Sequence, residues 1–242
     1  MKGDQDDGLD DPSARVDAMV RAGSGSATTP ESFFWPLFAV GTVILAQVLI
    51  PPKDRLGPPS VVPVIEGVAF VGLLLISAKP GPVSRQARPL VLTLLVVLAV
   101  ANAGSAIRLV LIVLDNHKVD GVPMTPSRLL IAGGLVLATN VVTFGVLYWQ
   151  LDAGGPDARL ADPMPYPDFQ FPQTSAPRLA PPRWRPKFAD HLYVSYTNLV
   201  AFSPTDTMPL TMRAKALMAV QSIISVGVLV VVLSRVINLL PS

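Results

Sequence analysis

Five long apolar runs, separated by short polar gaps, constrain the fold more than any other feature of the sequence. The runs cover residues 33–50, 61–78, 89–114, 126–149 and 211–240. A helix needs about 20 residues to cross the hydrocarbon core of a bilayer, and the runs approach or exceed that length, although the second is short. The pattern predicts an all-α integral membrane protein with about five transmembrane helices.

The ends of the fourth run carry clear helix signals. Thr125-Pro126 places a capping hydroxyl before a proline that suits the first helical position. Gly154-Gly155-Pro156 is typical of a helix end. The run closes on Tyr148-Trp149, an aromatic pair that we expect at the membrane–water interface.

The composition fits a membrane protein and argues against several other classes. Hydrophobic residues make up 50% of the chain and charged residues only 15%, whereas soluble domains carry roughly 25% charged residues. The net charge of +2 is too small to indicate nucleic-acid binding. Cysteine is absent, which excludes disulfides, thiolate metal sites and a cysteine nucleophile. Residues 1–28 are polar and acidic, and we expect a disordered tail without a signal peptide.

Two charged residues lie inside predicted spans, where each needs a partner or a wet cavity. Glu66 is near the start of the second run, and Arg108 is near the end of the third. Counted from the ends of the runs, both charges lie at about 8–9 Å depth on one side of the membrane. An ion pair between adjacent helices is therefore allowed, and a charge lining an ion or proton path is the alternative.

Two amides lie near the predicted midplane. Asn102 and Asn140 are each about twelve residues from the same membrane face, or about 18 Å. Small residues flank both amides, as close helix packing requires. We expect a hydrogen bond between the two helices, a stabilising role without chemistry.

The last part of the chain predicts a re-entrant segment. Asp190 can cap a helix that runs to about Val200, long enough to enter a bilayer but not to cross it. An irregular polar stretch follows before the fifth run. Irregular backbone at membrane depth is tolerated only where it is buried in protein or lines water.

Residues of this part resemble the pore of potassium channels. Aligned without a gap, Ser195-Tyr196-Thr197 falls in the pore helix, and Asp206 takes the place of the aspartate after the selectivity filter. Pro209, Thr211 and Lys215 match the residues that lead into the inner helix. With the Phe202–Asp206 stretch, the chain also looks like an uncharacterised bacterial family of membrane proteins related to these channels. The resemblance implies a pore-like module and assembly of identical subunits, with a tetramer favoured.

The filter itself departs from the potassium-channel pattern. The position of Thr-Val-Gly-Tyr-Gly is occupied by five residues of which none is glycine: Ala201, Phe202, Ser203, Pro204 and Thr205. Two glycines give that filter the backbone angles that point its carbonyls at the ion, and proline cannot adopt a positive φ. A potassium-type filter is therefore not expected. If subunits surround an axis, the pore-lining candidates are these five residues and Asp206, whose carboxylates would favour cations with weak discrimination.

These observations predict three regions and two competing functions. The regions are the tail 1–28, a three-helix membrane region 29–125, and a pore-like module 126–242 made of an outer helix 126–151, a proline-rich extended loop 152–189, a half-helix and loop 190–210, and an inner helix 211–240. We expect a weakly selective cation channel in the cell membrane, with monovalent cations and the lipid bilayer as its partners. The alternative is a non-conducting scaffold or accessory subunit that keeps the channel fold.

An enzyme is not expected, because His117 and His191 are the only histidines and no hydrolase or metalloprotease motif is present. No cofactor is expected either. The orientation stays open: a channel would place the N-terminus outside, whereas counting Lys and Arg in the loops gives no clear answer.

Overall fold

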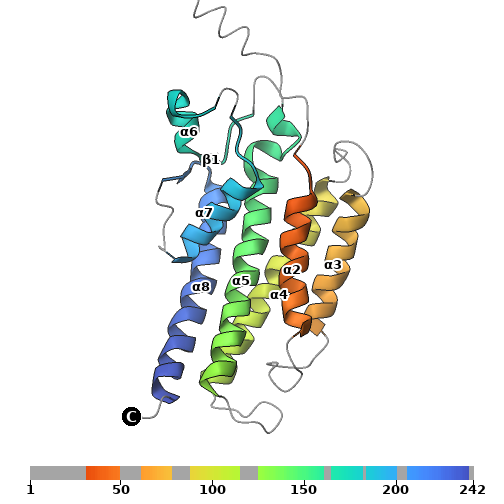
Figure 1. Cartoon of the computed structure of the whole chain (residues 1–242). Coiled ribbons are helices and arrows are strands. Elements are labelled where there is room, and N and C mark those ends of the chain that lie inside the picture. The colour runs from red at the N-terminus through yellow and green to blue at the C-terminus, as the bar shows by residue number, and fades with distance from the viewer. Residues whose placement is uncertain are drawn as a thin grey trace, which may run out of the picture.

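The computed structural model describes residues 31–49, 61–77, 88–114, 125–160, 165–181, 184–200 and 206–239, with residues 61–63 described by their backbone alone. The predicted tail 1–28 and the filter positions 201–205 lie outside these ranges. The described part is mainly helical (Figure 1).

Three helices are long and apolar enough to cross a membrane. They are α4 (Arg88–Leu114), α5 (Pro126–Leu151) and α8 (Met212–Leu239). Two further apolar helices are shorter, α2 (Phe34–Leu49) with 16 residues and α3 (Val61–Ser77) with 17. The membrane assignment therefore stands on three helices, and the expected number of five spans rests on the two shorter ones.

The ends of α5 follow the local signals of the sequence. The Thr125 side chain accepts a hydrogen bond from Arg128 N, and Pro126 occupies the first turn. Beyond the helix, Gly154 and Gly155 have φ angles of +84° and +99°. Glycine adopts such angles without the steric cost that a Cβ imposes, so the chain turns sharply here.

The long helices pack antiparallel around α5 (Figure 1). Helix α2 descends beside α5, α3 returns, and α4 descends again. Leu94 of α4 lies against Gly72 of α3, and Val232 of α8 lies against Gly133 of α5. Glycines at these positions allow close approach of the helices.

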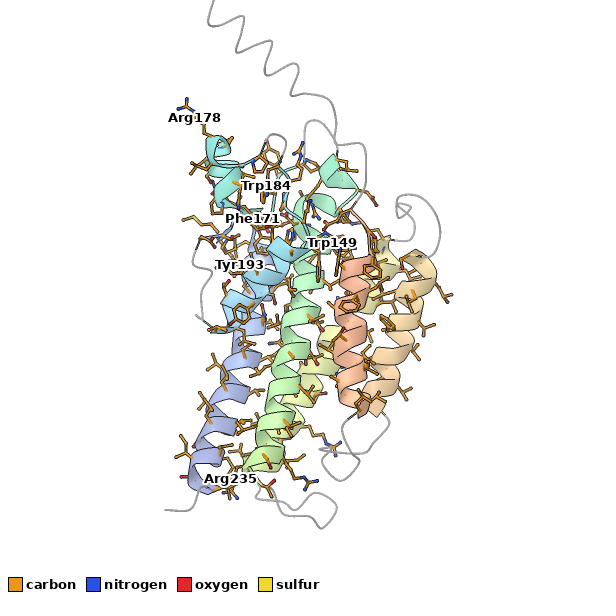
Figure 2. All side chains as sticks on the ribbon, viewed as in Figure 1. Trp149, Phe171, Arg178, Trp184, Tyr193 and Arg235 are labelled. Atoms are coloured by element: carbon orange, nitrogen blue, oxygen red, sulfur yellow. The ribbon has the colours of Figure 1, made fainter. Side chains whose placement is uncertain are left out.

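The outer surfaces of these helices are apolar. Val100 and Ile107 of α4 and Ile223 and Ile237 of α8 expose between 61% and 73% of their surface. Charged side chains gather toward the two ends, where Figure 2 shows Arg178 at one end of the molecule and Arg235 at the other. A lipid environment suits such a surface.

The connection between α5 and α8 folds into short elements rather than one extended segment. These elements are η2 (Asp152–Gly154), η3 (Ala158–Leu160), β1 (Phe169–Gln170), α6 (Pro172–Ser175), η4 (Pro177–Leu179), α7 (Phe188–Val200) and β2 (Met208–Pro209). Strands β1 and β2 pair antiparallel, with Phe169 opposite Pro209. In the described part of the predicted extended loop, Pro172 and Pro177 each start a one-turn helix, so this part is not extended throughout.

Helix α7 begins two residues before the expected cap. Asp190 lies inside its first turn, and its carboxylate accepts a hydrogen bond from Lys187 N at 2.7 Å. Glu31 supplies a second acceptor, for Phe188 N at 2.8 Å. The start of α7 is thus fixed by one carboxylate from its own first turn and one from the segment before α2.

Close packing between α5 and α7 predicts an asymmetric response to alanine. A Cβ at Gly145 would lie 3.0 Å from Leu192 Cδ1 and 3.1 Å from Leu192 Cα, whereas a Cβ at Gly134 would meet nothing within 4 Å. Both changes add the same helix propensity. We expect Gly145→Ala to be less stable in detergent than Gly134→Ala by about 1–3 kcal/mol, because α7 must shift. The measurement is the unfolding temperature of each variant, which should be lower for Gly145→Ala. Equal stabilities of the two variants would contradict this packing.

Candidate functional site

Helix α7 descends along α5 from the end of that helix toward its middle (Figure 1). Its first turn reaches Asp152, to which His191 Nε2 lies at 3.0 Å. One turn later, Ser195 Oγ donates to Val141 O at 2.7 Å. Val141 lies ten residues before Leu151, the last residue of α5, or about 15 Å along the axis.

The last turn of α7 packs against residues inside α8 and not against the first turn of α8. Asn198 Nδ2 donates to Met218 O at 3.1 Å, and Ser222 Oγ donates to Asn198 Oδ1 at 3.2 Å. These partners lie about 9–15 Å beyond the first residue of α8. The chain then returns, since Leu210 N donates to Asp168 O at 2.8 Å beside the β1–β2 pair. Helix α7 therefore descends between two long helices, and Leu210 lies back at the end where α7 begins.

The amide of Gln221 joins three helices inside this arrangement. Its Oε1 accepts from Tyr148 Oη at 2.6 Å and from Asn198 Nδ2 at 2.9 Å. Its Nε2 donates to Ser195 Oγ at 2.7 Å and to Ser195 O at 3.0 Å. Gln221, Tyr148 and Ser195 are fully buried. Tyr148 was expected at an interface, but this hydrogen bond places it in the core.

The two amides predicted near the midplane are in contact. Asn102 Nδ2 donates to Asn140 Oδ1 at 3.2 Å. Asn140 Nδ2 in turn donates to Ser225 Oγ at 2.8 Å and to Gln221 O at 3.3 Å. The network of Gln221 thus continues through α5 to α4, and the amide pair belongs to the packing of the bundle, as expected.

The expected pair of Glu66 and Arg108 is not formed. Glu66 is 2% exposed, whereas Arg108 is exposed, and no ion pair between described residues joins them. Gly72 lies against Leu94, so antiparallel packing brings Glu66 level with about residue 100 of α4. Arg108 is then about 12 Å further along the axis. Depth counted from the ends of the runs was misleading because α4 extends beyond α3.

The carboxylate of Asp152 fixes the loop above α7. Its Oδ1 accepts from Asp168 N at 2.8 Å and from Phe169 N at 3.2 Å. His191 places Nε2 on Asp152 and Nδ1 on Lys187 O at 2.8 Å. Lys187 O can only accept, so Nδ1 carries the hydrogen of that contact, and the geometry is that of a buried, hydrogen-bonded His191–Asp152 pair.

Two arginines complete this end of the molecule. Arg159 Nη1 donates to Trp149 O and Asp152 O at 2.8 and 2.9 Å. Burial lowers the pKa of Arg159, and the charge of Asp152 opposes that effect. Arg213, at the start of α8, binds both carboxylate oxygens of Asp168. The loop is therefore held to α5, α7 and α8 by charged hydrogen bonds.

The pore-lining candidates are placed only in part. Asp206 is exposed, and Thr207 next to it is buried. On α7, Tyr193 and Tyr196 expose about half of their surface on the side away from α5 (Figure 2 labels Tyr193). No group of three His, Asp or Glu residues in the described ranges is placed to hold a metal ion.

Sequence reasoning missed Gln221, Asp152, His191 and the Asp168–Arg213 pair as parts of one site. Gln221 alone carried a usable signal, because an amide inside an apolar run needs a partner. The others lie in or beside the proline-rich connection, where nothing in the sequence gives their neighbours.

Comparison with models of known protein families, with curated proteins and with solved structures finds no match for this chain.

The Asp152 cluster predicts a specific loss on neutralisation. Asp152→Asn leaves the buried His191 and Arg159 without their anion, and breaking a buried ion pair costs about 3–5 kcal/mol. We expect a lower unfolding temperature and trypsin cleavage after Arg159, which is 2% exposed in the native protein. Asp190→Asn removes the same charge but keeps an oxygen for Lys187 N, so it should stay resistant. Equal resistance of native protein and Asp152→Asn would contradict the role of the pair.

Proposed function

We propose that the chain is a pore-loop membrane protein that passes monovalent cations with weak selectivity. In this proposal α2 and α3 cross the membrane beside α4, α5 and α8, giving five spans in the cell membrane. Helix α7 is the half-helix that enters the bilayer without crossing it. The chain works as a homo-oligomer, with a tetramer favoured, and needs no cofactor.

The observation that carries the proposal is the descent and return of residues 188–210. Val141, the partner of Ser195 on α5, lies about 15 Å from the last residue of that helix, roughly half of a 30 Å hydrocarbon core. The walls on both sides, α5 and α8, are helices of spanning length. A short helix and an irregular stretch at such depth need protein or water around them, which a central axis between subunits would supply.

The proposed route for ions passes the carboxylate of Asp206, which lies between α7 and β2. Asp206 is exposed at the end of the segment that follows α7. Copies of this carboxylate around an axis would raise the local cation concentration and repel anions. Because Ser203 and Thr205 replace the filter glycines and Pro204 lies between them, the ring would pass cations without dehydrating potassium selectively.

One observation favours the alternative, a non-conducting scaffold. The polar side chains of α7 and α8 turn inward, where Ser195, Asn198 and Gln221 bond one another. The faces left outside carry Tyr193, Tyr196 and Val200 on α7 and Ile223 and Val230 on α8. Such faces suit a dry contact with another subunit or protein.

A flux measurement separates the two functions. We expect full-length protein in liposomes to pass sodium and potassium at similar rates and to exclude chloride. Asp206→Asn should lower the cation flux roughly tenfold at low ionic strength and less at high salt, because the effect is electrostatic. Asp190→Asn removes an equal charge from the first turn of α7 and serves as the matched control.

One result would contradict the conducting function, and another would contradict the role of Asp206. One is absence of flux from protein that is folded and oligomeric, which supports the scaffold. The other is an equal loss of flux in Asp206→Asn and Asp190→Asn, which removes Asp206 from the ion route.

A further inference from the structure

The N-terminal helices bury one carboxyl group that the proposed pore does not use. Glu66 of α3 is 2% exposed, and its Oε2 has no hydrogen-bond partner. The side chain is hydrogen-bonded by Gln47 of α2. Gln47 Nε2 also donates to Thr139 Oγ1 of α5 at 3.2 Å. Glu66 is therefore enclosed by three helices, with a single polar neighbour for its two oxygens.

Glu66 lies at the level of the central amides. The contact of Gly72 with Leu94 puts it about 3 Å along the axis from the level of Asn102. Asn102 is near the centre of α4, and its Oδ1 is the other buried oxygen in the described parts of α2–α4 that lacks a partner. The layer thus contains more hydrogen-bond acceptors than donors.

No cation of the neighbouring helices neutralises this carboxyl group. Helix α2 has no charged residue, and Glu66 is the one charged residue of α3. On α4, Arg88 and Arg108 lie toward its two ends, about 18 and 12 Å from the level of Glu66. On α5, Arg128 lies about 16 Å from the level of Thr139. A buried carboxylate this far from the positive charges of these helices is strongly disfavoured.

We propose that Glu66 is a proton-binding site: it holds a proton at neutral pH as a neutral carboxylic acid buried between α2 and α3. The proton turns one of its oxygens into a donor, which a layer with excess acceptors requires. Deprotonation would place an unpaired charge between α2, α3 and α5. These helices therefore carry a proton-dependent element that is independent of the segment around α7.

Infrared difference spectroscopy on full-length protein in liposomes tests this directly. At neutral pH we expect the carbonyl stretch of a protonated carboxyl group, which shifts in D₂O and is lost in Glu66→Gln. Glu66→Asp should displace the band rather than remove it, which also identifies the band if Glu66→Gln does not fold. Asp206→Asn should leave it unchanged.

Several outcomes would overturn the proton site. One is a native spectrum with carboxylate bands alone at neutral pH. Another is a protonated band that Glu66→Asp does not displace. A third is a band that sodium chloride removes and choline chloride leaves in place, because the resident ligand would then be a metal cation. None of these spectroscopic results depends on ion conduction, so they test the proton site separately from the proposed cation channel.

Discussion

The hydrogen bonds of Gln221 hold α5, α7 and α8 together. Within a bilayer no water can satisfy a buried amide, so its four contacts come from Tyr148 on α5 and from Ser195 and Asn198 on α7. The position of α7 depends on these bonds. The connection between α7 and the amides of Asn102 and Asn140 depends on Gln221 as well, since Asn140 donates a hydrogen bond to the main-chain oxygen of Gln221.

A second fixed point lies at the end of α5. Asp152 collects two backbone N–H groups and His191, which ties the loop to the first turn of α7. Asp168 then binds Arg213 and Thr211 at the start of α8. The first turn of α7 and the start of α8 are thus anchored by charged groups, and the later turns of α7 are anchored by amides.

Local signals explain how far the sequence alone predicts this fold. Thr125-Pro126 and the glycines after α5 set helix ends that the structure reproduces, because capping and positive φ angles depend on a few neighbouring residues. Asn102 and Asn140 were paired correctly, since both lie near helix centres. Glu66 and Arg108 were paired wrongly, because the run ends do not give the register between α3 and α4. The contacts of Asp152 join residues up to 39 positions apart, and no periodicity reports them.

The central claim is that α7 carries the chain below the membrane surface and back. The chain contains no cysteine, so single cysteines can be introduced without background. A fluorophore at Val200→Cys, on an exposed position of the last turn, can be compared with one at Met208→Cys, on β2. Quenching by nitroxides at defined depths in the lipid should place Val200 well below Met208. If headgroup nitroxides quench both positions equally, α7 lies flat at the surface and the pore-loop account is wrong.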